Sequence, residues 1–242
     1  MGHGRNLLVA VAAMVLMASA LVVGGDGAAA DDETVRFAVI GDYGFANADE
    51  QAVADLIDAQ AVDFVVTAGD NSYGPAPIDE NIGRYYSDYI GDYAGAYGSG
   101  SPVQRFFPSL GNHDVTDGGG LGAYLDYFTL PGAGIATSGT APSERYYDVI
   151  QGPVHLFLLN SNAQEPDGND AASTQAAWLQ AQLAASDAPW KLVVFHHTPY
   201  GSAPSGPTTA MQWPFREWGA DAVIAGHHHT YERLRVDGLP YF

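Results

Sequence analysis

The chain has 242 residues, of which 47% are hydrophobic and 12% aromatic, enough to bury the core of one sizeable α/β domain but hardly of two. Its formal net charge of -19 at pH 7 argues against a protein that holds nucleic acid or an anionic membrane through its overall field. Cysteine is absent, so disulfides and thiolate metal sites are excluded, and any metal site must use oxygen and imidazole ligands.

The first 30 residues have the pattern of a secretory signal peptide. Arg5 precedes an apolar run from Leu7 to Val23, and the small residues Ala28-Ala29-Ala30 offer a cleavage site before Asp31. The run nears the length of a membrane span, so an uncleaved anchor is the alternative, but the alanine-rich composition favours cleavage. We therefore expect a secreted or periplasmic protein with one mature domain, residues 31–242, and no stable membrane partner.

After the leader, short apolar runs rich in β-branched residues alternate with helical patterns. The expected strands are Val35–Ile40, Phe64–Ala68, Phe106–Leu110, Val154–Asn160, Leu192–Phe195 and Ala222–Ala225. The expected helices are Ala48–Ala59, Ile82–Tyr93 and Thr174–Ala185, with Ser173 as the N-cap of the last. Tyr231–Val236 is expected to form a strand that turns at Asp237-Gly238. This alternation is typical of an α/β sheet, in which ligands bind outside the carboxyl ends of the strands.

Side chains of the types that bind metal ions follow five of these strands. The segments are Gly41-Asp42-Tyr43-Gly44, Gly69-Asp70-Asn71-Ser72-Tyr73, Gly111-Asn112-His113-Asp114, His196-His197 and Gly226-His227-His228-His229. One Gly-Asp pair after a strand is more often a turn, and one histidine is more often a hydrogen-bonded residue. Five such segments at one rim of a sheet favour a metal site instead. A pair of ions would also supply the local positive charge that an anionic substrate needs in an acidic protein.

The chemistry of the set suits transition metals. Asp42, Asp70, Asn112, His196, His227 and His229 offer the hard or borderline ligands that iron, zinc and manganese accept. In an extended segment His227 and His229 point to one side and His228 to the other, so the outer pair is expected to converge. His196 and His197 likewise point opposite ways at a strand end, so only one of them is expected to reach a metal.

Taken in order, the motifs resemble a known family. Gly-Asp-x-Gly, Gly-Asp-x-x-Tyr, Gly-Asn-His-Asp, Val-x-x-His and Gly-His-x-His-x-Tyr-Glu-Arg follow one another between Val35 and Arg233, as in the calcineurin-like metallophosphoesterases. The narrower likeness, to the purple or tartrate-resistant acid phosphatases, rests on Tyr73 and on the Tyr-Glu-Arg after the histidines. The resemblance implies a single-domain, four-layer α/β/β/α sandwich. Because members of the family continue for further strands, we expect this chain to lack the last C-terminal strands.

The resemblance also implies a site for two metal ions. Asp42, Asp70, Tyr73 and His229 would hold a ferric ion, and Asp70 would bridge to an iron(II), zinc or manganese ion held also by Asn112, His196 and His227. The Val-x-x-His motif fits both His196 and His197, and the following Tyr200 and Ser202 favour His196. A phenolate such as Tyr73 is a hard, charged donor that suits a trivalent ion, although an aromatic packing residue is the plainer reading of a single tyrosine.

The implied function is a secreted phosphatase that hydrolyses small phosphate monoesters through attack by a metal-bound hydroxide. His113 would protonate the leaving group, and Asp114 would orient His113 or raise its pKa, unless Asp114 is only a turn residue. The segment Ser202–Thr209 lacks the histidine that small purple phosphatases commonly offer there. The alternatives are a phosphodiesterase or nucleotidase on the same metal core, and a secreted metal- or phosphate-binding protein without catalysis.

Overall fold

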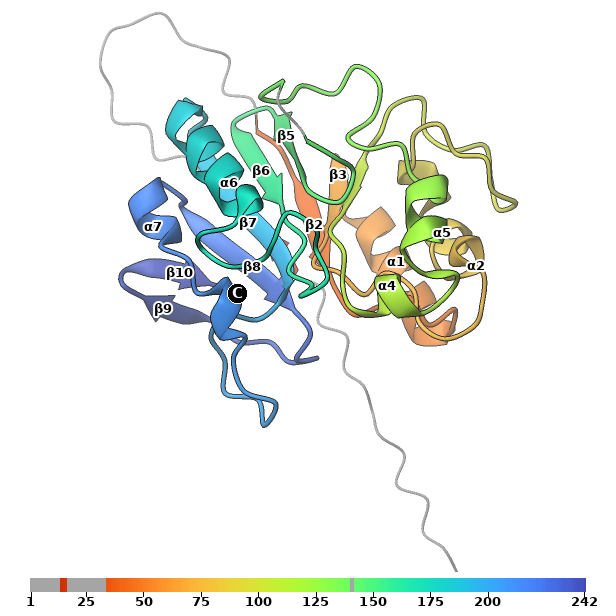
Figure 1. Ribbon diagram of the computed structural model, residues 1–242. Helices are drawn as coiled ribbons and strands as arrows, with labels where there is room; N and C mark the ends of the chain where they lie inside the picture. Colours follow the sequence, from red (N-terminus) through yellow and green to blue (C-terminus); the bar gives the residue numbers. More distant parts are fainter. Residues whose placement is uncertain (1–13, 17–33, 140–141) are drawn as a thin grey trace, which may run out of the picture.

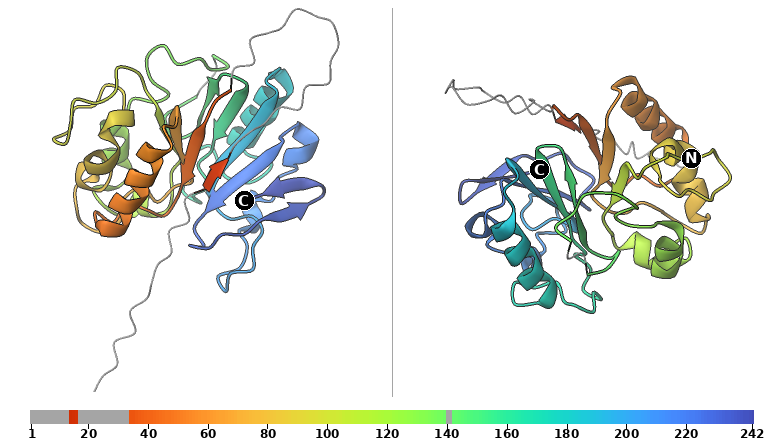
Figure 2. Two further views of the ribbon diagram at one scale, coloured as in Figure 1. Left: turned by 180° about the vertical axis from the view of Figure 1, so that it is seen from behind. Right: turned by 90° about the horizontal axis from the view of Figure 1, so that it is seen from above.

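The computed structural model describes residues 14–16, 34–139 and 142–242 (Figure 1). Two β-sheets lie face to face, with helices covering the outer side of each (Figure 2). Side chains from both sheets form one hydrophobic core between them, so the chain folds as a single unit. The predicted α/β/β/α sandwich is therefore confirmed. The predicted signal peptide lies outside the described residues, except for the strand β1 (Met14–Leu16).

The first sheet supplies three of the strand ends that carry candidate ligands. Its order is β1, β2 (Phe37–Ile40), β3 (Phe64–Thr67) and β4 (Phe106–Pro108). β2, β3 and β4 run parallel, and β1 pairs antiparallel with β2. All residues of β2, β3 and β4 are buried, as expected for parallel strands covered on both faces. Because these strands are parallel, their carboxyl ends lie at the same edge of the sheet.

The second sheet supplies the other two strand ends. Its order is β5 (Tyr147–Gln151), β6 (Val154–Leu158), β7 (Trp190–His197), β8 (Ala222–Gly226), β10 (Leu239–Tyr241) and β9 (Leu234–Val236). β6, β7, β8 and β10 are parallel, and the edge strands β5 and β9 are antiparallel to their neighbours. The predicted turn at Asp237-Gly238 joins β9 to β10, and both residues have positive φ, 49° and 83°.

Two of the three predicted helices are confirmed with their bounds. α1 (Ala48–Ala59) begins at Asn47, whose side chain accepts hydrogen bonds from the amides of Asp49 and Glu50. α6 (Thr174–Ala185) begins at the predicted cap Ser173, which accepts from the amide of Ala176. α6 and α7 (Phe215–Trp218) cover the outer face of the second sheet, and α1 lies on the outer side of the first (Figure 2).

The predicted helix Ile82–Tyr93 is wrong as one continuous helix, because its helical turns are short and end at Tyr89. The structure has α2 (Ile78–Asn81), α3 (Gly83–Tyr86) and a 3₁₀ turn (Ser87–Tyr89) in this region. The Tyr93 hydroxyl donates to Asp79 Oδ1 at 2.6 Å, and the Tyr127 hydroxyl, at the end of α5 (Gly120–Tyr127), donates to the same atom at 2.8 Å. These bonds fold the chain back onto Asp79, so tertiary contacts override the helical pattern.

Within the ranges that the structure describes, the helices are all too short or too polar to cross a membrane.

Candidate metal centre

The predicted metal-type side chains of both sheets meet where the carboxyl ends of the strands face each other. They come from the loops after β2 (Asp42), β3 (Asp70 and Tyr73) and β4 (Asn112), from the end of β7 (His196) and from the loop after β8 (His227 and His229). The backbone amide of His227 donates to both oxygens of Asp42, at 3.1 and 2.9 Å, across 185 residues of sequence. The spatial convergence on which the prediction depends is therefore present.

The first group of donors contains Asp42, Asp70 and His229, whose ligand atoms lie within 4.8 Å of one another. His229 Nε2 is 3.1 Å from Asp42 Oδ1. The Tyr73 hydroxyl lies in the middle of this group, 2.9 Å from Asp70 Oδ2, 3.4 Å from Asp42 Oδ1 and 3.1 Å from His229 Nε2. The four side chains that the resemblance assigned to one ion thus gather at one point.

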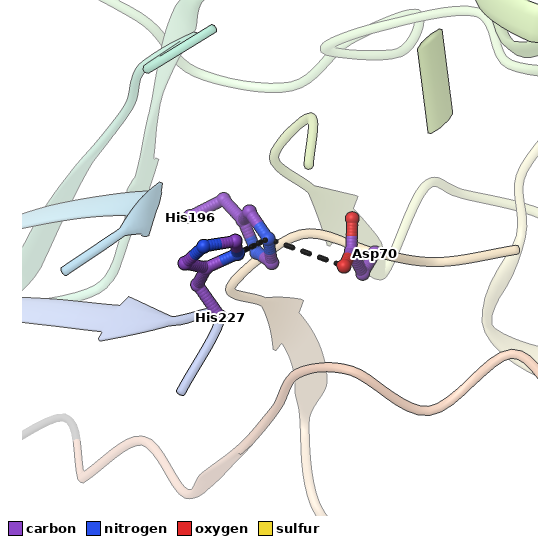
Figure 3. Close-up of side chains that lie close together, drawn as sticks. All are labelled: Asp70, His196 and His227. Atoms are coloured by element: carbon purple, nitrogen blue, oxygen red, sulfur yellow. Dashed lines mark hydrogen bonds and ion pairs between the residues drawn. The ribbon is translucent and has the colours of Figure 1, made fainter. Parts of the chain in front are cut away.

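The second group contains Asp70, His196 and His227, again with donor atoms within 4.8 Å of one another (Figure 3). His196 Nε2 lies 3.2 Å from Asp70 Oδ2, 3.1 Å from His227 Nδ1 and 3.1 Å from Asn112 Oδ1. Asp70 belongs to both groups, and the same oxygen, Oδ2, contacts Tyr73 in the first and His196 in the second. This is the position that a carboxylate bridging two ions requires.

The hydrogen bonds that the His196 ring can donate do not account for all of its short contacts. Its Nδ1 lies 2.9 Å from the carbonyl oxygen of Ala68, which can only accept, so Nδ1 carries the hydrogen. Burial acts to lower the pKa of His196, but the hydrogen bond and charge of Asp70 outweigh it and raise the pKa, so Nε2 can donate a hydrogen to Asp70. One hydrogen on Nε2 cannot also satisfy Asn112 Oδ1 and His227 Nδ1, both 3.1 Å away. A cation in its place would bind all of these donors, and donors that share an ion at 2.0–2.2 Å lie about 3 Å apart, close to the separations found. The donor set therefore fits a metal ion.

The charges of the site point the same way. Burial acts to raise the pKa of the Asp70 carboxyl, but the hydrogen bond and charge of His196, with the His113 amide, outweigh it and lower the pKa to about 2. Burial, together with the negative charges of Asp42 and Asp70, raises the pKa of the Tyr73 phenol. Asp70 is thus ionised, whereas Tyr73 needs a nearby cation to become a phenolate.

Four of the candidate ligands have left-handed backbone conformations. The φ angles of Asp42, Asp70, His227 and His229 are 56°, 51°, 75° and 51°. Such conformations are unfavourable for residues other than glycine and concentrate at functional sites. They also correct the expectation of an extended His-x-His segment: His227 and His229 do converge on the site, but through left-handed turns that direct them into different groups. His228 between them instead faces the Gly206 carbonyl oxygen, 3.2 Å from its Nε2.

Glycine at the start of two motifs is required by close approach. A Cβ atom on Gly226 would lie 2.6 Å from the Ala68 carbonyl oxygen and 2.7 Å from Asp42 Oδ2. A Cβ atom on Gly111 would collide with the backbone amide and the carboxylate of Asp70. These loops can bring their ligands together only because neither position has a side chain.

His113 lies at the edge of the first group. Its backbone amide donates to Asp70 Oδ1 at 2.8 Å, and its ring packs against that of Tyr73 with centroids 4.3 Å apart. Its Nδ1 lies 2.8 Å from Oδ2 of Asp117, which also accepts from the Gly74 amide at 2.8 Å. The sequence analysis missed Asp117, although its position four residues after His113 is the spacing at which side chains meet on a helix such as α4 (His113–Thr116).

The expectation that Asp114 orients His113 is wrong. Asp114 accepts hydrogen bonds from the Gly111 amide at 2.7 Å and from the backbone and side chain of Asn71 at 2.9 and 2.8 Å, and makes none to His113. It is 3% exposed, and burial raises its pKa to about 7. Asp114 therefore ties the loop after β3 to the loop after β4 behind the site, and holds Asp70 and Asn112 at a fixed separation.

His197, the alternative to His196, lies outside both groups. Its Nδ1 is 2.8 Å from the Ser161 hydroxyl, and its ring packs against that of His227 with centroids 4.7 Å apart. Burial, with the neighbouring His196 and His227, lowers its pKa to about 3, so the ring is neutral. The geometry favours His196 as the candidate ligand from this strand.

With this fold and site, the chain matches the calcineurin-like phosphoesterases over residues 35–231, and it belongs to that family. Tartrate-resistant acid phosphatase type 5 of Rattus norvegicus is 27% identical, with 86% of this chain and 71% of that protein covered. The same enzyme of Homo sapiens is 26% identical, with 95% and 77% covered. Purple acid phosphatase 21 of Arabidopsis thaliana is 27% identical, with 83% and 45% covered. The predicted resemblance is confirmed.

Among solved structures, the fold is similar to that of GAP50, the anchor in the inner membrane complex of Plasmodium. The TM-score is 0.58 and the identity 18%, with 86% of this chain and 70% of that chain covered, so this likeness concerns the fold alone. The family and its acid phosphatase members make this protein a metal-dependent phosphoric-ester hydrolase, and they imply a centre of two metal ions.

Proposed function

We propose that this protein is an acid phosphatase that hydrolyses small phosphate monoesters with two metal ions. The observation that carries the proposal is the position of Asp70 Oδ2, which lies 2.9 Å from the Tyr73 hydroxyl and 3.2 Å from His196 Nε2, between two convergent donor groups. The similarity to tartrate-resistant and purple acid phosphatases supports the choice of monoesters.

Each ion has a proposed set of ligands. Asp42, Asp70, Tyr73 and His229 would hold a ferric ion, because a phenolate suits a trivalent cation. Asp70, Asn112, His196 and His227 would hold iron(II), zinc or manganese. Bound there, the two ions would neutralise the phosphate oxygens and activate a water molecule for attack on phosphorus.

The protein itself supplies the proton for the leaving group. The contact between His113 Nδ1 and Asp117 fixes the imidazole so that Nε2 is the nitrogen left for the substrate. Held there, His113 would carry a proton on Nε2 and donate it to the ester oxygen as the bond to phosphorus breaks. Asp117 orients the ring and does not touch the substrate.

The proposal is tested on purified protein by metal analysis, an absorption spectrum and assays with p-nitrophenyl phosphate and its bis-ester. We expect two ions per chain, a visible tyrosinate-to-iron band and faster turnover of the monoester. Faster turnover of the bis-ester would favour a phosphodiesterase on the same core. Bound metal without turnover of either ester would favour a binding protein and contradict the phosphatase.

The roles of His113 and Asp117 are tested with aryl phosphates whose leaving groups differ in basicity. His113→Ala should slow the ester with the more basic leaving group by about 10²-fold or more and the other ester far less, since only the former needs the proton. Asp117→Asn should show the same selectivity with a smaller loss. Equal losses on both esters would contradict a proton-donating role for His113.

For localisation, we propose export with removal of residues 1–30, which leaves 31–242 as the catalytic domain. Support comes from the basic, apolar and small-residue order of the leader. N-terminal sequencing of the exported protein should begin at Asp31, and a retained Leu7–Val23 would contradict it.

A further inference from the structure

The exposed phenylalanine beside the metal centre has an unusual environment. The Phe45 side chain is 40% exposed, yet its ring stacks on that of Tyr73 with centroids 4.0 Å apart and planes 9° apart. The His113 ring also packs against Tyr73, with centroids 4.3 Å apart and a tilt of 40°. No ring contact joins Phe45 to His113 among the described residues, so the two rings lie on opposite faces of Tyr73. The phenol is thus clamped between them.

The loop that carries Phe45 is held in place at a local cost to stability. The Phe45 amide donates to the Tyr43 carbonyl oxygen at 2.7 Å and to Glu50 Oε2 at 3.1 Å, and the Ala46 amide donates to Glu50 Oε2 at 2.8 Å. Ala46 has a left-handed φ of 52°. Glu50 is 2% exposed, and its Oε1 has no hydrogen-bond partner. The left-handed backbone at Ala46 and the burial of a carboxyl group with an unpaired oxygen are each unfavourable alone.

The packing of the core does not explain this arrangement, because Phe45 is 40% exposed and belongs to neither hydrophobic core cluster. The loop instead places the Phe45 ring over Tyr73. A ring stacked on a phenol restricts its rotation and excludes water from that face. Excluding water strengthens the attraction between a phenolate and a cation, because the local dielectric constant falls.

We propose that Phe45 is a positioning residue for the metal held by Tyr73: it clamps the phenol against His113 and keeps its outer face dry, so that the ion is released slowly. The inference rests on the proposed function, because it takes Tyr73 as a ligand. It is specific to this loop, since it depends on the Phe45 ring and on the Glu50 carboxyl group, which accepts hydrogen bonds from the Phe45 and Ala46 amides.

The test compares four metal-loaded proteins: the wild type, Phe45→Ala, Phe45→Tyr and Tyr97→Ala. Phe45→Tyr keeps a ring that can stack, and Tyr97→Ala removes an aromatic residue of similar exposure, 43%, outside the donor groups. Release of iron to an excess of chelator is followed by metal analysis and by loss of the tyrosinate-to-iron band. Phe45→Ala should release the ion about 10-fold faster, the lower range for losing a group that supports a metal ligand. Phe45→Tyr and Tyr97→Ala should behave as the wild type.

Michaelis constants for an aryl and an alkyl phosphate separate this role from substrate binding. If Phe45→Ala raises KM for the aryl ester alone and leaves iron release unchanged, Phe45 contacts substrate and the inference is overturned. Unchanged release with unchanged kinetics overturns it as well. If Phe45→Ala folds poorly, judged by melting of the metal-free protein, Phe45→Leu takes its place. A wild type without the tyrosinate band would overturn the proposed function and this inference with it, whereas a wild type with the band and an unchanged variant overturns the inference alone.

Discussion

The two donor groups of the candidate metal centre are built in different ways. His196, in the second group, lies at the end of a core strand, is 0% exposed and is anchored to the Ala68 backbone at 2.9 Å. His229, in the first group, has a side chain 37% exposed, and Tyr73 depends on an exposed loop for its packing. The second group thus includes one ligand that is anchored in a core strand, whereas all residues of the first group lie on loops. Asp70 belongs to both groups.

The largest effect is expected from breaking both groups at once. Asp70→Asn removes the charge that the two groups share, so neither ion should bind tightly, and turnover should fall by about 10³-fold or more, equal to roughly 4 kcal/mol of barrier. Metal analysis and a phosphatase assay measure this. Asp187→Asn is the control, because Asp187 is exposed and precedes the amino end of β7, at the opposite end of this strand from His196. A variant that keeps both ions would show that Asp70 is no bridge.

The next prediction separates the groups. His229→Ala should abolish the tyrosinate-to-iron band, whereas His196→Ala should keep the band and lose the other ion. In the metal-free proteins, His196→Ala should lower the free energy of unfolding by more than about 1 kcal/mol, because it empties a buried position, and His229→Ala should change it by less than ~0.5 kcal/mol. Urea unfolding with metal analysis tests both. Identical behaviour of the two variants would contradict the difference between a core group and a loop group.

The remaining prediction concerns Glu50, which supports the loop group. Burial raises the pKa of Glu50 from its ordinary 4.5 to about 8, against the opposing effect of the Ala46 and Phe45 amides and of Arg84. The folded protein therefore holds a proton that the unfolded chain releases. Between these pH values Glu50 should lower the free energy of unfolding by up to ~1.4 kcal/mol per pH unit as the pH rises, with full stability below pH 4.5.

Glu50→Gln cannot release this proton, so its unfolding free energy should show a shallower dependence on pH than that of the wild type. Urea unfolding of both metal-free proteins at pH 5, 6, 7 and 8 measures the difference. Parallel curves would show that Glu50 does not titrate in this range.

Features encoded by local pattern were predictable from the sequence. α1 and α6 follow from apolar residues at helical spacing with a capping residue before each, and their bounds agree with the prediction. The convergence of Asp42, Asp70 and Asn112 follows because these residues come directly after parallel strands, whose ends must share one edge of a sheet. The His-x-His pair was placed correctly for the wrong reason, because no sequence pattern reports a left-handed φ at a histidine.

Features that depend on long-range contacts were not predictable. The helical pattern over Ile82–Tyr93 gave no sign that Asp79 would bind the hydroxyls of Tyr93 and Tyr127. Asp114 and Asp117 both follow His113 closely, and only the fold shows that Asp114 is taken by Asn71 and Gly111. The stacking of Phe45 on Tyr73 joins two loops from different strands, and no spacing along the chain encodes it.

The left-handed backbone at Asp42, Asp70, His227 and His229 limits how this site can change over evolutionary time. Aspartate, asparagine, histidine and glycine tolerate this conformation better than β-branched residues, so drift at these positions is restricted even when selection for metal binding is relaxed. A descendant that had lost its chemistry would still carry a similar motif, with asparagine or glycine replacing a few ligands. In paralogues, therefore, an intact donor set is informative, whereas a merely similar motif is weak evidence of activity.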